Sequence, residues 1–309
     1  MDDQSPAFTE AQIIARLREV FASTDPRIEV GIGDDAAVVA GEKRQVMTTD
    51  MAVEGVHFRT DWSTGFEIGR KVTAANAADI LAMGAVADYL LVAVALTPSQ
   101  KMEWIDDLAR GIKFEADLAG LKVIGGDISR SEKVVISMAA VGHCKEAITR
   151  DGAKVGDGIY LSSLTGWSAA GFALLQSQTL PTGQAHSIAL REFKSPTIDY
   201  GFDTSKATAL CDVSDSIVEQ AGQIAKASQV ALNFDKELFS RSEEFVDLKS
   251  LADELKVDVW DWIFGGGEDH VLLATGVDLP GLSIGQVTAG EGVFGIPLSV
   301  ADKAWRHFS

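Results

Sequence analysis

The chain has 309 residues, of which 46% are hydrophobic and 23% charged, as in a globular protein long enough for two domains. Its formal net charge of -18 argues against a nucleic-acid-binding surface, which needs clustered lysine and arginine facing phosphates. The charge does not exclude phosphate ligands, because divalent metal ions can supply the missing positive charge.

Neither end of the chain nor its apolar stretches predict a membrane protein. The first residues carry no basic region and no apolar core, so we expect no secretory signal. The longest apolar stretch, Tyr89 to Leu96, is far too short to span a bilayer. Cys144 and Cys211 are the only cysteines, which favours two buried free thiols in a cytoplasmic protein.

Periodicity predicts alternating strands and helices in the first half of the chain. A helix is expected to begin at a capping box at 9–12 and to end before Pro26, and Ser99 is expected to cap a later one. Gly84 and Gly120 are placed as C-terminal stops of helices at 66–83 and 99–119. Strands are expected at 44–49, 89–96, 121–124 and 133–144.

The second half repeats this order loosely after a turn-rich segment at 151–158. Strands are expected at 159–163 and 270–275, with helices from about Ser168 and after Ser214. Residues 180–205 contain two prolines and have weak periodicity, which predicts irregular structure. We therefore predict an α/β or α+β fold, with an N-terminal domain of residues 1–149 and a C-terminal domain of residues 150–309.

Aspartates recur where elements are expected to end. Asp34 and Asp35 lie in a glycine-flanked loop, Asp50 and Asp127 at strand ends, and Asp212 and Asp215 before a helix. Ligand-binding loops gather at strand ends in α/β sheets, and carboxylates are suitable ligands for Mg²⁺. Taken singly, each acid has an ordinary alternative as a solvated turn, an Asx turn or a helix cap. Together they favour a site for divalent cations.

Asp79 differs because it is expected inside a helix rich in alanine and leucine. No basic residue stands three or four positions away, and an unpaired buried carboxylate would be costly. Asp79 therefore either faces solvent or binds a cation, and we favour the cation.

Five further positions have both an ordinary and a functional interpretation. His57 fits a satisfied, partly buried histidine, and Gly126 fits either a plain turn or close backbone approach to a phosphate. Glu268, with Asp269 beside it, follows three glycines, either in a hairpin turn or presented to a ligand. Arg150 fits a surface residue or a phosphate fork, and Trp305 either packs or stacks on a heterocycle.

Taken in order, these motifs resemble the thiamine-monophosphate kinase family, within the wider superfamily of aminoimidazole ribonucleotide synthetase. The matching stretches run from residue 31 to residue 308: GIGDDAAVV, TTDMAVEGVHF, KVTAANAADILAMGA, VIGGDISRS, TRDGAKVGD, DVSDSI, GGGEDHVLL and WRHF. The chain departs from the family pattern at Ser216, His270, Val271 and Ala304.

The resemblance implies ATP-dependent phosphorylation of thiamine monophosphate to thiamine diphosphate in the cytoplasm, with several Mg²⁺ ions. It also implies a two-domain synthetase-like fold, in which the N-terminal domain contributes to the β-barrel of a homodimer. It places metal ligands at Asp35, Thr48, Thr49, Asp50, Asp79, Asp127, Asp212 and Asp215. ATP contacts are implied at Gly126, Asp127, Arg150 and Ser214, and substrate contacts at His57, Glu268 and Trp305.

Asp50 and Asp127, expected at neighbouring strand ends, are our choice for the metal ion nearest the transferred group. No Walker A motif or protein-kinase signature occurs, so ATP would be held through metal-bridged phosphates and glycine backbone. The alternatives are another synthetase of the superfamily or a non-catalytic acidic metal-binding protein. We expect no nucleic-acid or membrane partner.

Overall fold

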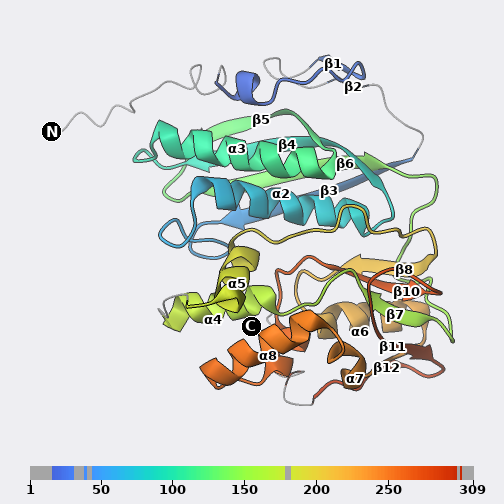
Figure 1. Ribbon diagram of the computed structural model, residues 1–309. Coiled ribbons are helices and arrows are strands. Elements are labelled where there is room, and N and C mark those ends of the chain that lie inside the picture. Colours follow the sequence, from blue (N-terminus) through green and yellow to red (C-terminus); the bar gives the residue numbers. More distant parts are fainter. Residues whose placement is uncertain (1–15, 31–37, 40–43, 178–181, 298–299, 301–309) are drawn as a thin grey trace. The chain divides into compact units, whose positions relative to one another are not determined.

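The computed structural model describes residues 16–30, 38–39, 44–177, 182–297 and 300 (Figure 1). Within these ranges the chain divides into two compact units. Unit 1 comprises the described residues up to 80 together with 85–145, and unit 2 comprises 81–84 together with those from 146 onward. The roles predicted for the two domains, 1–149 and 150–309, stay predictions.

Unit 1 is built on a four-stranded sheet with the strand order β3-β6-β4-β5. These strands are β3 (Gln45–Val53), β6 (Val135–His143), β4 (Val86–Leu96) and β5 (Lys122–Arg130). β6 pairs antiparallel with both β3 and β4, whereas β4 and β5 are parallel. A separate antiparallel pair joins β1 (Ile28–Val30) to β2 (Val38–Val39).

Figure 1 shows α2 (Gly65–Leu81) and α3 (Met102–Ala119) on the same side of this sheet. Alternate residues of β6 are buried there, and Met138 accepts a hydrogen bond at its sulfur from Thr73 of α2. On β3, Met47 and Met51 are 68% and 58% exposed, whereas Ala52 is buried. The sheet therefore packs one face on two helices and leaves apolar side chains exposed on β3.

Unit 2 contains a six-stranded sheet with the order β12-β9-β11-β7-β10-β8. The strands are β7 (Gly158–Leu161), β8 (Ala207–Asp212), β9 (Ala231–Phe234), β10 (Leu272–Gly276), β11 (Leu282–Thr288) and β12 (Gly292–Phe294). Its helices are α4 (Trp167–Ser177), α5 (Gln184–Lys194), α6 (Ile217–Ser228), α7 (Lys236–Phe239), α8 (Glu243–Leu255) and α9 (Val259–Gly265). β12 and β9 are parallel, and the other pairings are antiparallel. Phe239 and Phe264 are fully buried in its core, with ring centroids 5.2 Å apart.

Several predicted elements are confirmed. Gly120 ends α3 in the left-handed conformation at φ 80°, and Gly84 follows α2 at φ 64°. The mixed α/β class is also confirmed, with a larger sheet packed on helices in each unit. Of the predicted first helix, residues 16–20 are helical and residues 9–15 lie outside the described ranges.

Other expectations are wrong. Ser99 does not cap α3, because Lys101 occupies the N-cap position and makes no side-chain cap bond. Helix α5 lies within the segment expected to be irregular. β3 continues three residues past Asp50, and β5 continues three residues past Asp127. Cys211 is buried as expected, but Cys144 is only partly buried. No helix in the described ranges is both long enough and apolar enough to cross a bilayer.

The backbones of α2 and α3 approach each other closely at glycines. A Cβ atom added to Gly69 would lie 2.3 Å from the carbonyl oxygen of Leu108, and one added to Gly111 would lie 2.0 Å from that of Phe66. Real Cβ atoms do not approach this closely, so the helix pair depends on both glycines.

Replacing Gly69 with alanine should lower the free energy of unfolding by roughly 1–3 kcal/mol, because the helices must move apart. Gly222 in α6 is the matched control, since a Cβ there meets nothing within 4 Å. Gly222→Ala should instead raise stability by up to about 1 kcal/mol. Denaturant unfolding of both variants measures this, and equal effects would contradict the assigned packing role of Gly69.

Candidate functional site

In unit 1, side-chain oxygens from a strand and a helix meet at Thr48 and Asp79. The Thr48 hydroxyl donates to Asp79 Oδ2 at 2.6 Å. Asp50 lies two residues further along β3, so it shares the face of Thr48. Sequence analysis expected Asp79 either to face solvent or to bind a cation, and neither alternative included this hydrogen bond. The bond satisfies part of the hydrogen-bonding capacity of a half-buried carboxylate. Thr48, Asp50 and Asp79 thus place oxygen donors on the helix-facing side of β3.

Thr49 points to the opposite face of β3, as the alternation of a strand requires. Its hydroxyl donates to the carbonyl oxygen of Met138 at 2.8 Å. Thr48 and Thr49 are therefore adjacent in sequence but are presented to different sides of the sheet.

Asp50 and Asp127 do not lie at neighbouring strand ends, so that expectation is wrong. They lie within β3 and β5, the two edge strands, with β6 and β4 between them. Three strand spacings amount to about 14 Å. Asp127 pairs with Ala93, Ala93 with Ser137, and Ser137 with Met51, so Asp127 shares the face of Met51 rather than that of Asp50. The sheet of one chain does not bring these two carboxylates side by side.

Two other predicted residues of unit 1 have local structural partners. The Nδ1 atom of His57 accepts a hydrogen bond from the Val53 amide at 3.1 Å, so the ring's donor is Nε2–H in the neutral form. A Cβ on Gly126 would lie 1.7 Å from the Val92 carbonyl oxygen. The close packing of β4 against β5 therefore already requires glycine at Gly126.

In unit 2, two distant sequence motifs lie against each other. The Glu268 amide donates to the Ser214 carbonyl at 2.6 Å, and the His270 amide donates to the Val213 carbonyl at 2.9 Å. A Cβ on Gly267 would lie 2.4 Å from the Asp215 carbonyl oxygen, so glycine is needed for this approach. The residues after the three glycines form no hairpin turn. They pair instead with the segment that follows β8.

Asp212, the last residue of β8, is buried against a histidine. Its Oδ2 lies 3.1 Å from His270 Nδ1. Arg150 lies close enough to Cys211 for its charge to act on the thiol. Burial and the charge of Asp212 raise the pKa of the Cys211 thiol, although Arg150 opposes this shift. Cys211 is therefore a protonated thiol at neutral pH.

The start of α6 is capped by Ser216, whose Oγ accepts from the Glu219 amide at 3.2 Å. The capping alternative for Asp212 and Asp215 therefore does not describe this helix. Ser214 accepts a hydrogen bond at Oγ from the Gln220 side chain at 3.4 Å. The Gln220 Oε1 atom is buried and has no partner among the described residues.

Asp269, which follows Glu268 in the GGGED motif, is a buried acid to which the family resemblance assigned no role. Its Oδ2 accepts from the Gly166 amide at 2.8 Å, and its Oδ1 accepts from the Ser168 amide at 2.9 Å. Burial raises the pKa of Asp269 to about 6, and these two hydrogen bonds oppose the shift. The GGGED motif pointed to Glu268 and Asp269 together, but only Glu268 was assigned a substrate contact, and nothing in the local sequence reveals that Asp269 contacts the start of α4.

Two of the predicted site residues, Asp35 and Trp305, lie outside the described residues, as does Asp34. In the part of the chain that is described, no three His, Cys, Asp or Glu side chains are grouped closely enough to hold a metal ion. Mg²⁺ usually takes only one or two carboxylates, completed by water and substrate phosphates. The hydroxyl and carboxylates of Thr48, Asp50 and Asp79 fit that donor chemistry.

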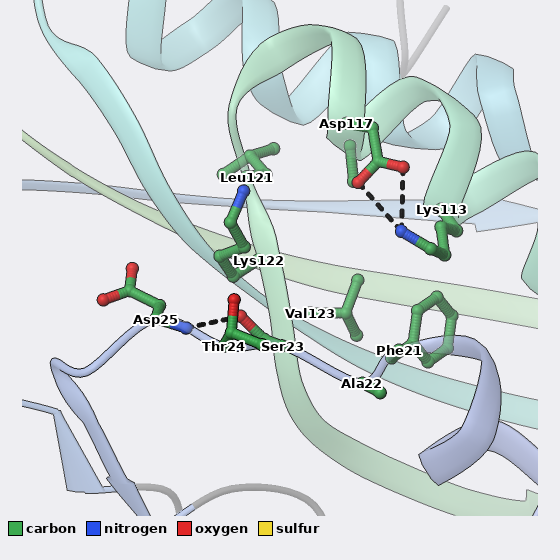
Figure 2. A pocket seen from close by; sticks show the side chains of 11 residues that line it. Phe21, Ala22, Ser23, Thr24, Asp25, Lys113, Asp117, Leu121, Lys122 and Val123 are labelled. Atoms are coloured by element: carbon green, nitrogen blue, oxygen red, sulfur yellow. Dashed lines mark hydrogen bonds and ion pairs between the residues drawn. The ribbon is translucent and has the colours of Figure 1, made fainter.

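A cavity of about 360 Å³ lies in unit 1, beside the C-terminal part of α3, and Figure 2 shows the side chains that line it. It is lined by residues 21–25 together with side chains of α3 and of the start of β5. Lys113 and Asp117 in its wall form an ion pair at 2.8 Å, and the Asp25 amide donates to Ser23 Oγ. The cavity contains none of the predicted site residues.

Comparison with known proteins supplies independent information. The family of AIR synthase related protein, N-terminal domain, matches residues 33–144. The chain is 36% identical over 273 residues to the thiamine-monophosphate kinase of Corynebacterium glutamicum, covering 83% of this chain and 81% of that one.

Two solved structures share the fold across nearly the whole length. The thiamine-monophosphate kinase of Stenotrophomonas maltophilia K279a has a TM-score of 0.79 at 30% identity, covering 94% of this chain and 97% of its own. A structure of AaThiL complexed with AMPPCP and TMP has a TM-score of 0.78 at 29% identity, covering 97% of each chain.

The pKa of Asp269 leads to a prediction about stability. Because its pKa is raised in the folded state from 3.8 to about 6, the folded protein binds more protons than the unfolded chain between these values. Relative to Asp269→Asn, the wild-type protein should lose up to roughly 3 kcal/mol as pH rises from about 4 to 6. Chemical denaturation of both proteins across this range measures the difference. A constant difference, or a gain with rising pH, would refute the raised pKa.

Proposed function

The chain belongs to the thiamine-monophosphate kinase family, and on that premise we propose that it transfers the γ-phosphoryl group of ATP to thiamine monophosphate. The products are thiamine diphosphate and ADP. The observation that carries this proposal is the match, over nearly all of both chains, to the structure complexed with AMPPCP and TMP. AMPPCP is an ATP analogue, so that complex contains both kinds of ligand that the reaction requires.

The acceptor in this reaction needs little chemical activation. The second pKa of a phosphate monoester is about 6, so the acceptor is mostly a dianion at neutral pH. The main obstacle is electrostatic, because two unit charges about 4 Å apart repel by roughly 4 kcal/mol at an effective dielectric constant of 20. We therefore propose direct in-line transfer in which positioning and charge neutralisation supply most of the rate enhancement.

We propose that Mg²⁺ supplies the positive charge that the chain lacks. Thr48, Asp50 and Asp79 carry this proposal, because they present oxygen donors on one face of β3. The other proposed ligands are Asp35, Thr49, Asp127, Asp212 and Asp215. When bound, Mg²⁺ neutralises phosphate charge and orients the reacting groups. Asp50 and Asp127 keep their proposed catalytic roles, although they do not meet within one sheet.

We assign the ligand contacts from the family motifs. Gly126, Asp127, Arg150 and Ser214 are the proposed ATP contacts. His57, Glu268 and Trp305 are the proposed contacts to thiamine monophosphate. Within unit 2, this assignment is supported by the backbone pairing of the Ser214 and Glu268 segments and by the position of Arg150 beside Cys211.

We also propose that the protein is a cytoplasmic homodimer in which the unit 1 sheets of two copies form a β-barrel. The exposed Met47 and Met51 on β3 support this proposal, and Val86 and Leu91 on β4 are 61% and 38% exposed. Exposed apolar side chains on a sheet that is covered by helices on its other face are typical of an interface.

The activity is tested by incubating the protein with ATP, Mg²⁺ and thiamine monophosphate and quantifying thiamine diphosphate by chromatography. Asp50→Asn should lower turnover at least about tenfold, because a charged oxygen ligand is lost. Asp117→Asn, in an exposed ion pair on α3, is the control and should keep wild-type turnover. Normal turnover of a folded Asp50→Asn variant would refute the role of Asp50, and no product from the wild-type protein would refute the function.

The proposed dimer is tested by sedimentation equilibrium. Met51→Asp should raise the dissociation constant at least about tenfold, because a charge would be buried between the sheets. Val246→Asp is the control, since Val246 is 64% exposed on α8 in unit 2. A monomeric wild-type protein, or equal dimerisation of both variants, would exclude this interface.

A further inference from the structure

We propose that Asp269 is a positioning residue, which holds Glu268 in the backbone conformation that contacts thiamine monophosphate. The inference rests on the proposed function, because it assumes that Glu268 binds this substrate. It assigns a role to a residue that is buried and is not itself expected to touch either substrate.

The first observation is the set of contacts that Asp269 makes. Asp269 is 5% exposed, and its two carboxylate oxygens accept backbone hydrogen bonds from Gly166 and Ser168 at 2.8 and 2.9 Å. Both donors lie at the start of α4, where free N–H groups and the helix dipole favour a carboxylate. Asp269 thus ties the segment of Glu268 to the start of α4.

The second observation is backbone strain on both sides of Asp269. Glu268 has φ 64° and His270 has φ 53°, in the left-handed region that non-glycine residues rarely adopt. Such residues persist only where the surrounding structure determines their conformation, and they cluster at ligand sites. A segment with two of them in three residues therefore needs strong anchors.

The anchors lie on two sides of the segment. On one side, the amides of Glu268 and His270 bond to the carbonyls of Ser214 and Val213. On the other side, Asp269 bonds to α4. The amide hydrogen bonds of Glu268 and His270 fix the backbone to the Ser214 segment. The hydrogen bonds of Asp269 keep the two strained residues from rotating about that attachment. Both are needed to fix the direction of the half-buried Glu268 side chain.

Weakening the Asp269 anchor should affect substrate binding through Glu268. Asparagine at this position keeps one oxygen acceptor, but its amide group faces a backbone N–H without accepting from it. Glu268 would then visit less strained conformations, and the fraction of protein ready to bind substrate would fall. The expected result is a higher KM for thiamine monophosphate with little change in the KM for ATP.

A double-mutant cycle tests this inference. Asp269→Asn should raise the KM for thiamine monophosphate about tenfold, and Glu268→Ala should raise it by about tenfold or more. If Asp269 acts through Glu268, adding Asp269→Asn to Glu268→Ala should change this KM by less than about twofold. Asp269→Glu, which keeps the charge but is one methylene longer, provides a second variant if the asparagine variant does not fold.

Asp157→Asn is the matched control. Asp157 is also 5% exposed and accepts from a backbone amide, that of Lys154, at 2.8 Å. Asp157 directly precedes Gly158, the first residue of β7. Gly158 pairs with Gly276, which is the last residue of β10 and lies at the end of that strand away from Asp269. Asp157→Asn should lower the melting temperature while leaving the KM for thiamine monophosphate within about twofold of wild type.

The possible results separate the inference from the proposed function. An unchanged KM in a folded Asp269→Asn variant would overturn the inference, as would its full effect persisting in the Glu268→Ala background. An equal KM change in Asp157→Asn would show a general effect of lost stability and would also overturn it. Absence of thiamine diphosphate from the wild-type reaction would instead overturn the proposed function.

Discussion

In each unit of this strongly acidic chain, local hydrogen bonds hold carboxylates at or beside the predicted site residues. Asp79 accepts from a threonine hydroxyl, Asp212 lies against a histidine ring, and Asp269 accepts from two backbone amides. The hydroxyl donor to Asp79 and the amide donors to Asp269 satisfy carboxylate oxygens without cancelling their charge. Asp79, held by a hydroxyl donor, stays able to attract a cation, which is what a site for polyanionic phosphates requires.

The sequence predicts the elements better than it predicts their ends. Gly120 ends α3 and Gly84 lies in the turn that follows α2, both for a local reason, namely the left-handed conformation that glycine adopts easily. Helix α5 was missed because prolines at 181 and 196 suggested a loop, but they flank this helix and do not interrupt it. Asp50 was expected to end a strand after two threonines, and Asp127 to end one after two glycines, yet both lie inside edge strands.

Predicting which acids meet is harder, because the answer depends on strand order rather than on sequence spacing. Thr48 and Asp79 meet because α2 packs on the face of the sheet that Thr48 occupies. In the sheet, β6 and β4 lie between β3, which contains Asp50, and β5, which contains Asp127. The order of the strands along the chain, β3, β4, β5 and β6, does not reveal this separation. The Ser214 segment follows β8 and the Glu268 segment precedes β10. These two strands are neighbours in the sheet but far apart in sequence, so the contact could not be predicted from sequence spacing.

Family membership and geometry explain different properties of the same residues. Gly126 and Gly267 both lie in family motifs, yet each is already required by a backbone carbonyl within 2.4 Å of where a Cβ would lie. Glycine at these positions is therefore no evidence of phosphate contact by itself. Glu268 and His270 are the opposite case. Both adopt a positive φ although neither is glycine, so the residue type does not favour the conformation found here. Their strain persists because the Ser214 segment and the start of α4 hold the loop from two sides, which makes this loop the strongest structural sign of a ligand site in unit 2.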